Sequence, residues 1–427
     1  QSGYREGLND YVKQKQAAVN LVNSVGNLMF NKGVELVLFR NHLVDISLSE
    51  VINLFSNYAN KVLNSPIDVH IAAEVAAELL NIDLAPSKID LGKLTAEYVA
   101  EQANFSSIND FLSNKLANFT GLDKHTFEAK DVVLYGFGRI GRLVVRELIK
   151  QAGKGQQLLL KAIVLRTVTD DQIIKRAALL RNDSVHGAFK GTVEEDLVNK
   201  ALIINGQKIQ LIEAKNPSEV NYSQFGINNA LLIDSTGVFN TKEALSQHLE
   251  NNEVSKVLLT APGKGIPNIV YGINQDEFDL EENNIFSAAS CTTNAISPIL
   301  NVIENTFEIE KGHIETIHAY TNDQNLLDNM HKKPRRGRSA AINMVISSTG
   351  AGNAVVKVIP SLLNKLTANA VRVPTPNGSL AIMNLNLKNK TSLEEVNNAI
   401  KQAALSGALV NQINYQVNEE LVSNDII

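Results

Sequence analysis

The segment SAASCTTNAISP, Ser287 to Pro298, holds the single cysteine of this 427-residue sequence. A lone cysteine is by default a small buried hydrophobic residue, whereas a catalytic thiolate needs an electropositive, partly exposed position and a nearby base. The hydroxyl residues around Cys291 predict a helix N-terminus, where backbone N–H groups lower a thiol pKa and stabilise an oxyanion. His318, in TIHAYT at the end of the next expected strand, is the natural base, although any of the 8 histidines can instead be structural.

Three segments further along the chain contain groups that bind phosphate. PRRGRS contains Arg336, SSTGAG contains Thr349 and Gly350, and VRVPTP contains Arg372. Arginines and hydroxyl or glycine N–H donors hold phosphate dianions by charge-assisted hydrogen bonds. Each arginine alone also fits a solvated loop, so an anion site requires that these segments converge in space.

The segment VVLYGFGRIGR carries Gly136, Gly138 and Gly141 in the spacing G-x-G-x-x-G. It follows an apolar run typical of a strand and opens a stretch typical of a helix. Glycines in such a turn let the backbone approach a pyrophosphate, which then lies at the positive end of the helix. Alone the pattern also fits a structural turn, but its position between strand and helix favours a dinucleotide site.

The acidic residue that binds the ribose hydroxyls of NAD is expected about 20 residues further on, at the end of the second strand. The second apolar run, LLLKAIVL, leads instead into Arg166 and Thr167. No carboxylate then repels a 2'-phosphate, and a guanidinium is near enough to pair with one. The sequence therefore favours NADP or dual use of NADP and NAD. The alternative is that Arg166 faces solvent and other groups hold the ribose.

The composition excludes several classes of protein. The net charge is -5 and the sequence has no block of like charges, so nucleic-acid binding is not expected. A single cysteine excludes an intramolecular disulfide framework and a thiolate metal cluster, and no metal site is expected. Because the chain has no disulfides to form, a reducing compartment, the cytoplasm, is predicted. The sequence contains no apolar run of about 18 residues, so no membrane-spanning segment is expected.

The expected fold class is α/β, with a Rossmann-type dinucleotide-binding domain and an α+β catalytic domain preceded by a mainly helical N-terminal extension. Residues 1–128 show helical spacing and the capping-box pattern SLSE, although the apolar VELVLFRN also fits a strand. Residues 129–290 alternate short apolar runs with amphipathic stretches, which indicates a parallel sheet with crossover helices. Residues 291–427 form the expected catalytic domain.

These motifs together resemble a known family. YGFGRIGR, DSVHG, DSTGVF, SAASCTTNAISP, HAYTNDQ, SSTGAG and VRVPTP occur in the order and spacing of phosphorylating glyceraldehyde-3-phosphate dehydrogenases. The resemblance runs from about Asp131 to the last residue and is greatest to longer bacterial members with an N-terminal segment. It implies a homotetramer, with the polar loop 322–338 near a neighbouring subunit.

The resemblance also implies roles for individual residues. Cys291 attacks the aldehyde to form a hemithioacetal, and His318 takes the proton as hydride leaves for the nicotinamide of NAD(P), giving a thioester that inorganic phosphate cleaves. The implied reaction is the reversible oxidation of D-glyceraldehyde 3-phosphate to 1,3-bisphosphoglycerate, in glycolysis and gluconeogenesis. The implied cofactor contacts are Gly136, Gly138, Arg139, Ile140, Gly141, Ser235, Thr236 and Thr260. The implied contacts for the attacking phosphate are Ser290, Thr292, Arg336, Thr349 and Gly350, and those for the substrate phosphate are Thr321 and Arg372.

The sequence departs from the family pattern in several places. Thr167 stands where the family has its ribose-binding aspartate, and Asn329 and Met330 stand where NAD-specific members have Leu-Pro, which again points towards NADP. The sequence ends at LVSNDII, where the family continues, so the C-terminal part of the pattern is expected to be missing. The extension has no counterpart in short members and is expected to be a stabilising appendage.

Alternative functions remain open at this stage. An erythrose-4-phosphate dehydrogenase differs in a substrate that is longer by one carbon, and the sequence does not discriminate between the two aldehydes. A semialdehyde dehydrogenase needs one carboxylate clamp instead of two phosphate sites. A non-catalytic dinucleotide-binding module has no need of a nucleophile, so the pair of Cys291 and His318 weighs against it.

Overall fold

The computed structural model describes residues 2–121, 128–150, 153, 155–347 and 349–426. The chain forms two compact units, of which the first comprises Gln1–Asp131, Val145–Leu160 and Asn414–Val417 and the second comprises the remainder. Among the described residues, no helix combines the length and the apolar character needed to cross a lipid bilayer.

The N-terminal extension is built on one long helix, α1 (Ser2–Asn27). Ala18, Leu21 and Val25 recur on one side of it and are almost fully buried, as their helical spacing predicts. The helix passes into a π-helical segment, Leu28–Lys32, and stops at Gly33, whose φ of 70° is a left-handed conformation that glycine adopts at little cost.

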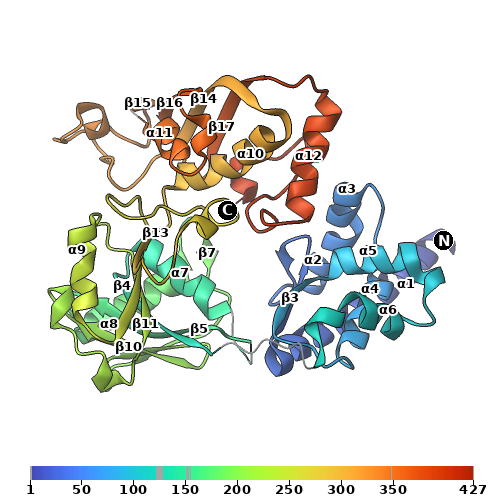
Figure 1. Ribbon diagram of the computed structural model, residues 1–427. Coiled ribbons are helices and arrows are strands. Elements are labelled where there is room, and N and C mark those ends of the chain that lie inside the picture. The colour runs from blue at the N-terminus through green and yellow to red at the C-terminus, as the bar shows by residue number, and fades with distance from the viewer. Residues whose placement is uncertain (1, 122–127, 151–152, 154, 348, 427) are drawn as a thin grey trace. The chain divides into compact units, whose positions relative to one another are not determined.

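A small sheet accompanies these helices. The segment VELVL forms β1 (Val34–Leu38), which pairs antiparallel with β2 (Asn41–His42) and parallel with β3 (Ser87–Asp90). The expected capping box is confirmed, because the Ser47 hydroxyl accepts from the Glu50 N–H while the Glu50 carboxylate accepts from the Ser47 N–H. The other helices of the extension, shown in blue to teal in Figure 1, are α2 (Leu48–Asn53), α3 (Ala59–Leu63), α4 (Val69–Leu79), α5 (Leu91–Glu101) and α6 (Ile108–Lys115).

The second unit contains the predicted dinucleotide-binding sheet, with strand order β13-β12-β11-β4-β5-β10-β9-β8. The strands from β13 to β10 are parallel, and β9 and β8 join antiparallel at one edge. The strands are β4 (Lys130–Tyr135), β5 (Leu158–Leu165), β8 (Val193–Asp196), β9 (Ala201–Ile204), β10 (Gln207–Glu213), β11 (Ala230–Asp234), β12 (Val254–Leu259) and β13 (Ile285–Ser287).

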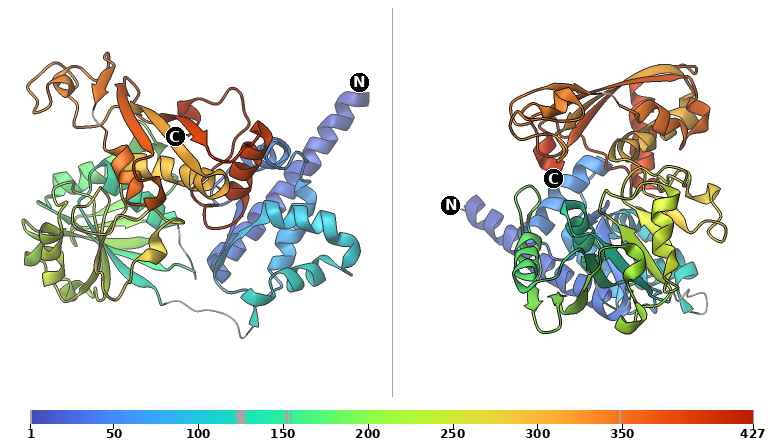
Figure 2. Two further views of the ribbon diagram at one scale, coloured as in Figure 1. Left: turned by 45° about the horizontal axis from the view of Figure 1, so that its top comes forward. Right: turned by 90° about the vertical axis from the view of Figure 1, so that its left-hand side faces the viewer.

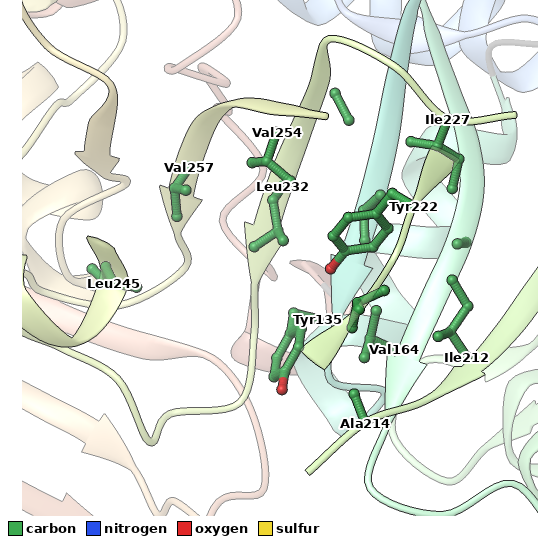
Figure 3. Packing of buried hydrophobic residues seen from close by; sticks show 14 of the residues in the cluster. Tyr135, Val164, Ile212, Ala214, Tyr222, Ile227, Leu232, Leu245, Val254 and Val257 are labelled. Atoms are coloured by element: carbon green, nitrogen blue, oxygen red, sulfur yellow. The ribbon is translucent and has the colours of Figure 1, made fainter. Parts of the chain in front are cut away.

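Helices connect the strands of this sheet, as a parallel arrangement requires. They are α7 (Arg139–Lys150), α8 (Asp170–Arg181) and α9 (Lys242–Ser246) (Figure 1). Figure 3 shows the apolar core on one face of the sheet, where Val164, Leu232 and Val257 from three strands pack beside Tyr135 and Tyr222. Burial on the sheet explains why these strands read as almost continuous apolar runs.

The catalytic domain is α+β, as expected. Its sheet has the order β15-β16-β14-β17, in which β14 (Ile309–Ala319) lies parallel to β16 (Leu366–Val373) and antiparallel to β17 (Ser379–Leu387), and β15 (Val345–Ser347) is an antiparallel edge strand. Its helices, visible beside the sheet in both views of Figure 2, are α10 (Cys291–Phe307), α11 (Ala351–Val356) and α12 (Leu393–Leu405).

The two faces of this second sheet differ. Met383 and Leu385 pack with α10 residues such as Leu300 and Ile303 in one apolar cluster. Leu380 and Ile382 alternate with them along β17 and point to the opposite face, because successive side chains of a strand alternate. Their side chains are 56% and 43% exposed, so the second face of the sheet carries uncovered apolar surface.

Candidate active site

Cys291 is the first residue of α10, and the chain enters the helix through a strained turn. Ser290 is the N-cap, and its hydroxyl oxygen accepts a hydrogen bond of 3.0 Å from the N–H of Thr293. Ala289 has φ 58°, a left-handed conformation that costs a residue with a side chain about 1–3 kcal/mol. The thiol is therefore exposed at the positive end of a helix of 17 residues.

The thiol faces the imidazole of His318. Cys291 Sγ lies 3.5 Å from His318 Nε2. His318 Nδ1 lies 2.6 Å from the carbonyl oxygen of Ala319, a contact that requires an Nδ1–H donor, so Nε2 is the nitrogen that exchanges a proton with sulfur. The hydrogen bond to His318 is the main cause that lowers the pKa of Cys291, and the same bond raises the pKa of His318. Both shifts favour a thiolate–imidazolium pair.

A cavity of about 340 Å³ opens beside this pair. The predicted residues that line it are Ser290, Cys291, Thr292, His318, Thr349, Gly350 and Arg372. Sequence reasoning did not single out several other lining residues, among them Asn268, Thr316, Ser347 and Lys357. Two of the three segments predicted to bind phosphate, SSTGAG and VRVPTP, thus reach the cavity beside the thiol, whereas no residue of PRRGRS lines it.

The pairing of β14 with β16 brings the base and an arginine together. His318 and Arg372 are register partners near the ends of these parallel strands. Arg372 Nη1 donates to Thr321 Oγ1 at 2.9 Å and to the carbonyl oxygen of Ala319 at 3.2 Å. Burial lowers the pKa of Arg372, and the nearby Arg336 lowers it further. Guanidinium groups make strong charge-assisted hydrogen bonds to carboxylates and phosphates.

Arg336 does not line the cavity itself but is hydrogen-bonded to Ser347, which does. Its Nη2 donates to the Ser347 hydroxyl at 3.0 Å, and its Nη1 contacts the carboxylate of Asp323, which also accepts from Thr321. Burial raises the pKa of Asp323, but the hydrogen bonds from Thr321 and Arg336 outweigh burial, and the pKa falls below its ordinary value. Sequence reasoning missed Asp323, although it lies in the quoted segment HAYTNDQ.

The glycine turn after β4 has the shape of a pyrophosphate cradle. Gly136 has φ 97°, and a Cβ on Gly141 would lie only 2.6 Å from the Gly136 carbonyl oxygen and 2.8 Å from Ser235 Oγ. A Cβ on Gly138 would meet open space, which leaves room for a ligand. Arg139 and Ile140, at the start of α7, are exposed beside it. These residues fit a dinucleotide, because Gly136 allows the turn, Gly141 allows close packing, and the open space at Gly138 allows a ligand to approach the backbone.

The remaining predicted cofactor residues follow the neighbouring strands. Ser235 Oγ donates to the Gly136 carbonyl oxygen at 3.0 Å, so β11 and the glycine turn are bonded directly. The carboxylate of Asp234 accepts from the backbone and hydroxyl of Thr236, and its backbone oxygen accepts from the N–H and hydroxyl of Thr260. His248, fully buried, contacts the other carboxylate oxygen of Asp234 at 3.0 Å. Sequence reasoning missed this buried pair.

The sequence predicts no carboxylate at the end of β5, but the structure has one nearby. Arg166 and Thr167 follow β5 and are both exposed, and the Thr167 hydroxyl donates to the Gln172 side chain at 2.8 Å. However, Glu213 at the end of β10 accepts from the Val168 N–H at 2.9 Å. A carboxylate thus reaches this edge from another strand. Asn329 and Met330 lie in the polar loop of the catalytic domain, where Met330 is 92% exposed.

A Rossmann-type domain with a glycine cradle, followed by a domain with a thiol–imidazole pair, defines a dinucleotide-dependent oxidoreductase that uses a cysteine. Two family models match the chain: the NAD binding domain of glyceraldehyde 3-phosphate dehydrogenase over residues 130–242 and its C-terminal domain over residues 290–427. The chain belongs to the glyceraldehyde-3-phosphate dehydrogenase family.

Curated relatives agree with this assignment. A glyceraldehyde-3-phosphate dehydrogenase-like protein of Pseudomonas aeruginosa is 44% identical over 410 residues, which cover 95% of this chain and 88% of that protein. The glyceraldehyde-3-phosphate dehydrogenase of Priestia megaterium is 38% identical over 298 residues (70% of this chain, 84% of that protein), and the chloroplastic enzyme A of Zea mays is 40% identical over 308 residues (71% and 74%). The match to the Pseudomonas protein covers 95% of this chain and therefore includes most of the N-terminal extension.

Proposed function

We propose that the protein catalyses the reversible, phosphorylating oxidation of D-glyceraldehyde 3-phosphate to 1,3-bisphosphoglycerate. The observation that carries the proposal is the 3.5 Å contact between Cys291 Sγ and His318 Nε2 in a cavity that Arg372 also lines. In the proposed reaction the Cys291 thiolate adds to the aldehyde carbon and forms a hemithioacetal. The protonated His318 gives its Nε2 proton to the resulting alkoxide oxygen, and the neutral Nε2 takes this proton back as the hemithioacetal carbon loses a hydride and becomes a thioester.

The nicotinamide dinucleotide, when bound at the glycine cradle, supplies the acceptor for the hydride that leaves this carbon. Inorganic phosphate attacks the thioester carbon, the C–S bond breaks and Cys291 is released as a thiolate. The backbone N–H groups at the start of α10 stabilise the negative oxygen in both addition steps. The raised pKa of His318 suits this cycle, because the imidazole must hold a proton beside the thiolate and exchange that proton with the substrate oxygen during the reaction.

Two anions enter this reaction, and two sets of residues are proposed to bind them. The attacking phosphate is assigned to Ser290, Thr292, Arg336, Thr349 and Gly350, and the substrate phosphate to Thr321 and Arg372. The 2.9 Å bond between Arg372 and Thr321 supports the second set, because it holds a cation and a hydroxyl together before any ligand is present. The bond between Arg336 and Ser347, a residue of the cavity wall, supports the first.

The coenzyme is proposed to be NADP or both NADP and NAD. The support is the lack of a carboxylate at Thr167 and the exposed guanidinium of Arg166 at the end of β5. The proposed domains are 1–128, 129–290 and 291–427. Roles in glycolysis and gluconeogenesis, a cytoplasmic location and a homotetrameric assembly complete the proposal. The uncovered face of β17 and the exposed loop side chains Leu326, Leu327 and Met330 support the assembly.

Initial rates of cofactor reduction test the proposal, with Cys291→Ser as the control. The aldehydes D-glyceraldehyde 3-phosphate and erythrose 4-phosphate are compared, each with NAD and NADP and with varied phosphate. We expect cysteine-dependent reduction that requires phosphate and prefers the three-carbon aldehyde. Arg336→Leu is expected to raise the KM for phosphate, and Arg372→Leu the KM for aldehyde, each about tenfold or more. Activity that persists in Cys291→Ser, or that ignores phosphate, contradicts the proposal.

A further inference from the structure

Glu213 places a carboxylate where the sequence leaves one out. Its Cα pairs with that of Leu165, the last residue of β5, and the N–H of the next residue, Ala214, donates to the Leu165 carbonyl oxygen at 2.8 Å. From this position Glu213 Oε2 accepts from the Val168 N–H at 2.9 Å. The exposed carboxylate of β10 therefore lies beside residues 166–168, at the strand end where a Rossmann domain holds the adenosine ribose.

The other charged groups near this edge do not replace it. Asp170, in the first turn of α8, pairs with Lys200 at 2.5 Å, so its charge is largely compensated. Asp171 is exposed in the same turn, and Arg166 is exposed at the strand end. Glu213 is thus the carboxylate that is bonded to the backbone of the β5–α8 connection.

We propose that Glu213 sets the selectivity between NAD and NADP, an inference that rests on the proposed use of these coenzymes. The carboxylate accepts a hydrogen bond from a free ribose 2'-hydroxyl, as the missing aspartate does in the family pattern. A 2'-phosphate cannot donate such a bond when ionised, is repelled by the carboxylate, and finds the Val168 N–H already occupied. Glu213 therefore balances the attraction of Arg166 and keeps NAD binding competitive.

The test is a pair of equilibrium titrations that involve no turnover. ADP-ribose and 2'-phospho-ADP-ribose differ only in the group at issue, and their binding is measured by isothermal calorimetry with the full chain. Removal of the charge in Glu213→Gln is expected to shift the ratio of the two dissociation constants about tenfold towards the 2'-phosphorylated ligand. Glu194→Gln removes an exposed carboxylate on β8 and is expected to leave the ratio unchanged.

The outcomes separate the inference from the function beneath it. An unchanged ratio in Glu213→Gln, or equal weakening of both ligands, shows that Glu213 only supports the loop and overturns the inference while coenzyme binding stands. Failure of the wild-type protein to bind either ligand overturns the proposed coenzyme site as well. If Glu213→Gln does not fold, as judged by circular dichroism, Glu213→Ala and Glu213→Asp carry the comparison. In that case Glu213→Ala must shift the ratio of dissociation constants towards the 2'-phosphorylated ligand, and Glu213→Asp must leave it nearer the wild-type value.

Discussion

Cys291 and His318 change each other's acid–base behaviour. A thiol in water titrates near pH 8.5, and the contact with His318 lowers the pKa of Cys291 while it raises that of the imidazole. Thiolate is therefore present at lower pH than for a free cysteine, and it persists as pH rises. The reactive pair requires a protonated His318, so the pair is lost when pH passes the raised pKa of the imidazole.

His318→Asn is expected to return the thiol towards its ordinary pKa and to remove the proton acceptor. Turnover is expected to fall about 10²- to 10⁴-fold. The rate of alkylation by iodoacetamide at pH 7 is expected to fall, and the midpoint of its pH profile to move upwards. His313→Asn is the matched control, since His313 lies on the same strand and bonds Thr367 instead. An alkylation profile that does not move would contradict the assigned role of His318.

At the residue scale, local features of the site follow from neighbouring residues, whereas contacts between distant segments do not follow from either segment alone. The cap at Ser290 and the exposed position of Cys291 follow from neighbouring residues, and both were predictable. Glu213 and Val168 are 45 residues apart, and their contact was not expected. Arg372 and Thr321 are 51 apart, and only the family resemblance placed them in one site. Such contacts depend on which strands pair, and nothing in either local segment specifies that pairing.

The glycine turn joins β4 to α7, and its glycines have different reasons to be there. Gly141→Ala is expected to destabilise the free protein by about 1–3 kcal/mol, because its Cβ would meet the Gly136 carbonyl oxygen and Ser235. Gly138→Ala is expected to leave thermal stability nearly unchanged and to weaken ADP-ribose binding, because its Cβ would occupy open space. Thermal melts and calorimetric titrations of both variants check this contrast. Equal melting temperatures for the two variants would contradict it.

The short hairpin of β6 (Asn182–Asp183) and β7 (Gly187–Ala188) depends on one carboxylate. Asp183 accepts from the N–H groups of Val185 and His186 at 2.9 Å each. Burial raises its pKa, but these bonds and the His186 side chain outweigh burial and lower the pKa to about 2. His186 in turn contacts Asn377 of the catalytic domain at 3.1 Å, so the carboxylate also positions that contact.

A carboxyl whose pKa falls on folding stabilises the native state above its unfolded pKa, and that contribution is lost as pH falls through the folded value. Asp183→Asn is therefore expected to cost about 1–2 kcal/mol at pH 7, and the cost is expected to shrink between about pH 5 and pH 2. Urea unfolding at pH 7, 4 and 3 measures the difference. The exposed Asp171→Asn serves as control, and a cost that does not depend on pH would contradict the explanation.

At the scale of the whole molecule, the uncovered apolar face of the catalytic sheet bears on the proposed oligomeric assembly. Leu380 and Ile382 stand on this face, and monomeric proteins rarely leave large apolar patches in water. Leu380→Lys combined with Ile382→Lys is expected to convert an oligomer into smaller species, as measured by light scattering after gel filtration. Val198→Asn, at a 91% exposed turn of the other domain, is the control for a surface change. A wild-type protein that is already monomeric would contradict the assembly.

The α/β sheet of the dinucleotide-binding domain was largely predictable, because repeated local patterns in the sequence specify it. Apolar runs such as LLLKAIVL and the turn at Gly136 specify a parallel sheet with a glycine cradle, and the sheet contains both. The small sheet of the extension was only an option in the sequence, because five apolar-rich residues fit a helix or a strand equally well. The antiparallel strands β8 and β9 were not distinguished either, since strand direction follows from loops rather than from composition.

The exposed thiol at the start of α10 also carries a chemical liability. A thiolate that is accessible to an aldehyde is accessible to peroxide, which converts it to a sulfenic acid. Proteins commonly protect such a group by forming a disulfide with a second cysteine, but these 427 residues contain only one. Recovery of an oxidised Cys291 within this chain therefore requires a reductant from outside, and the same exposure that makes the residue reactive leaves it dependent on the thiol pool around it.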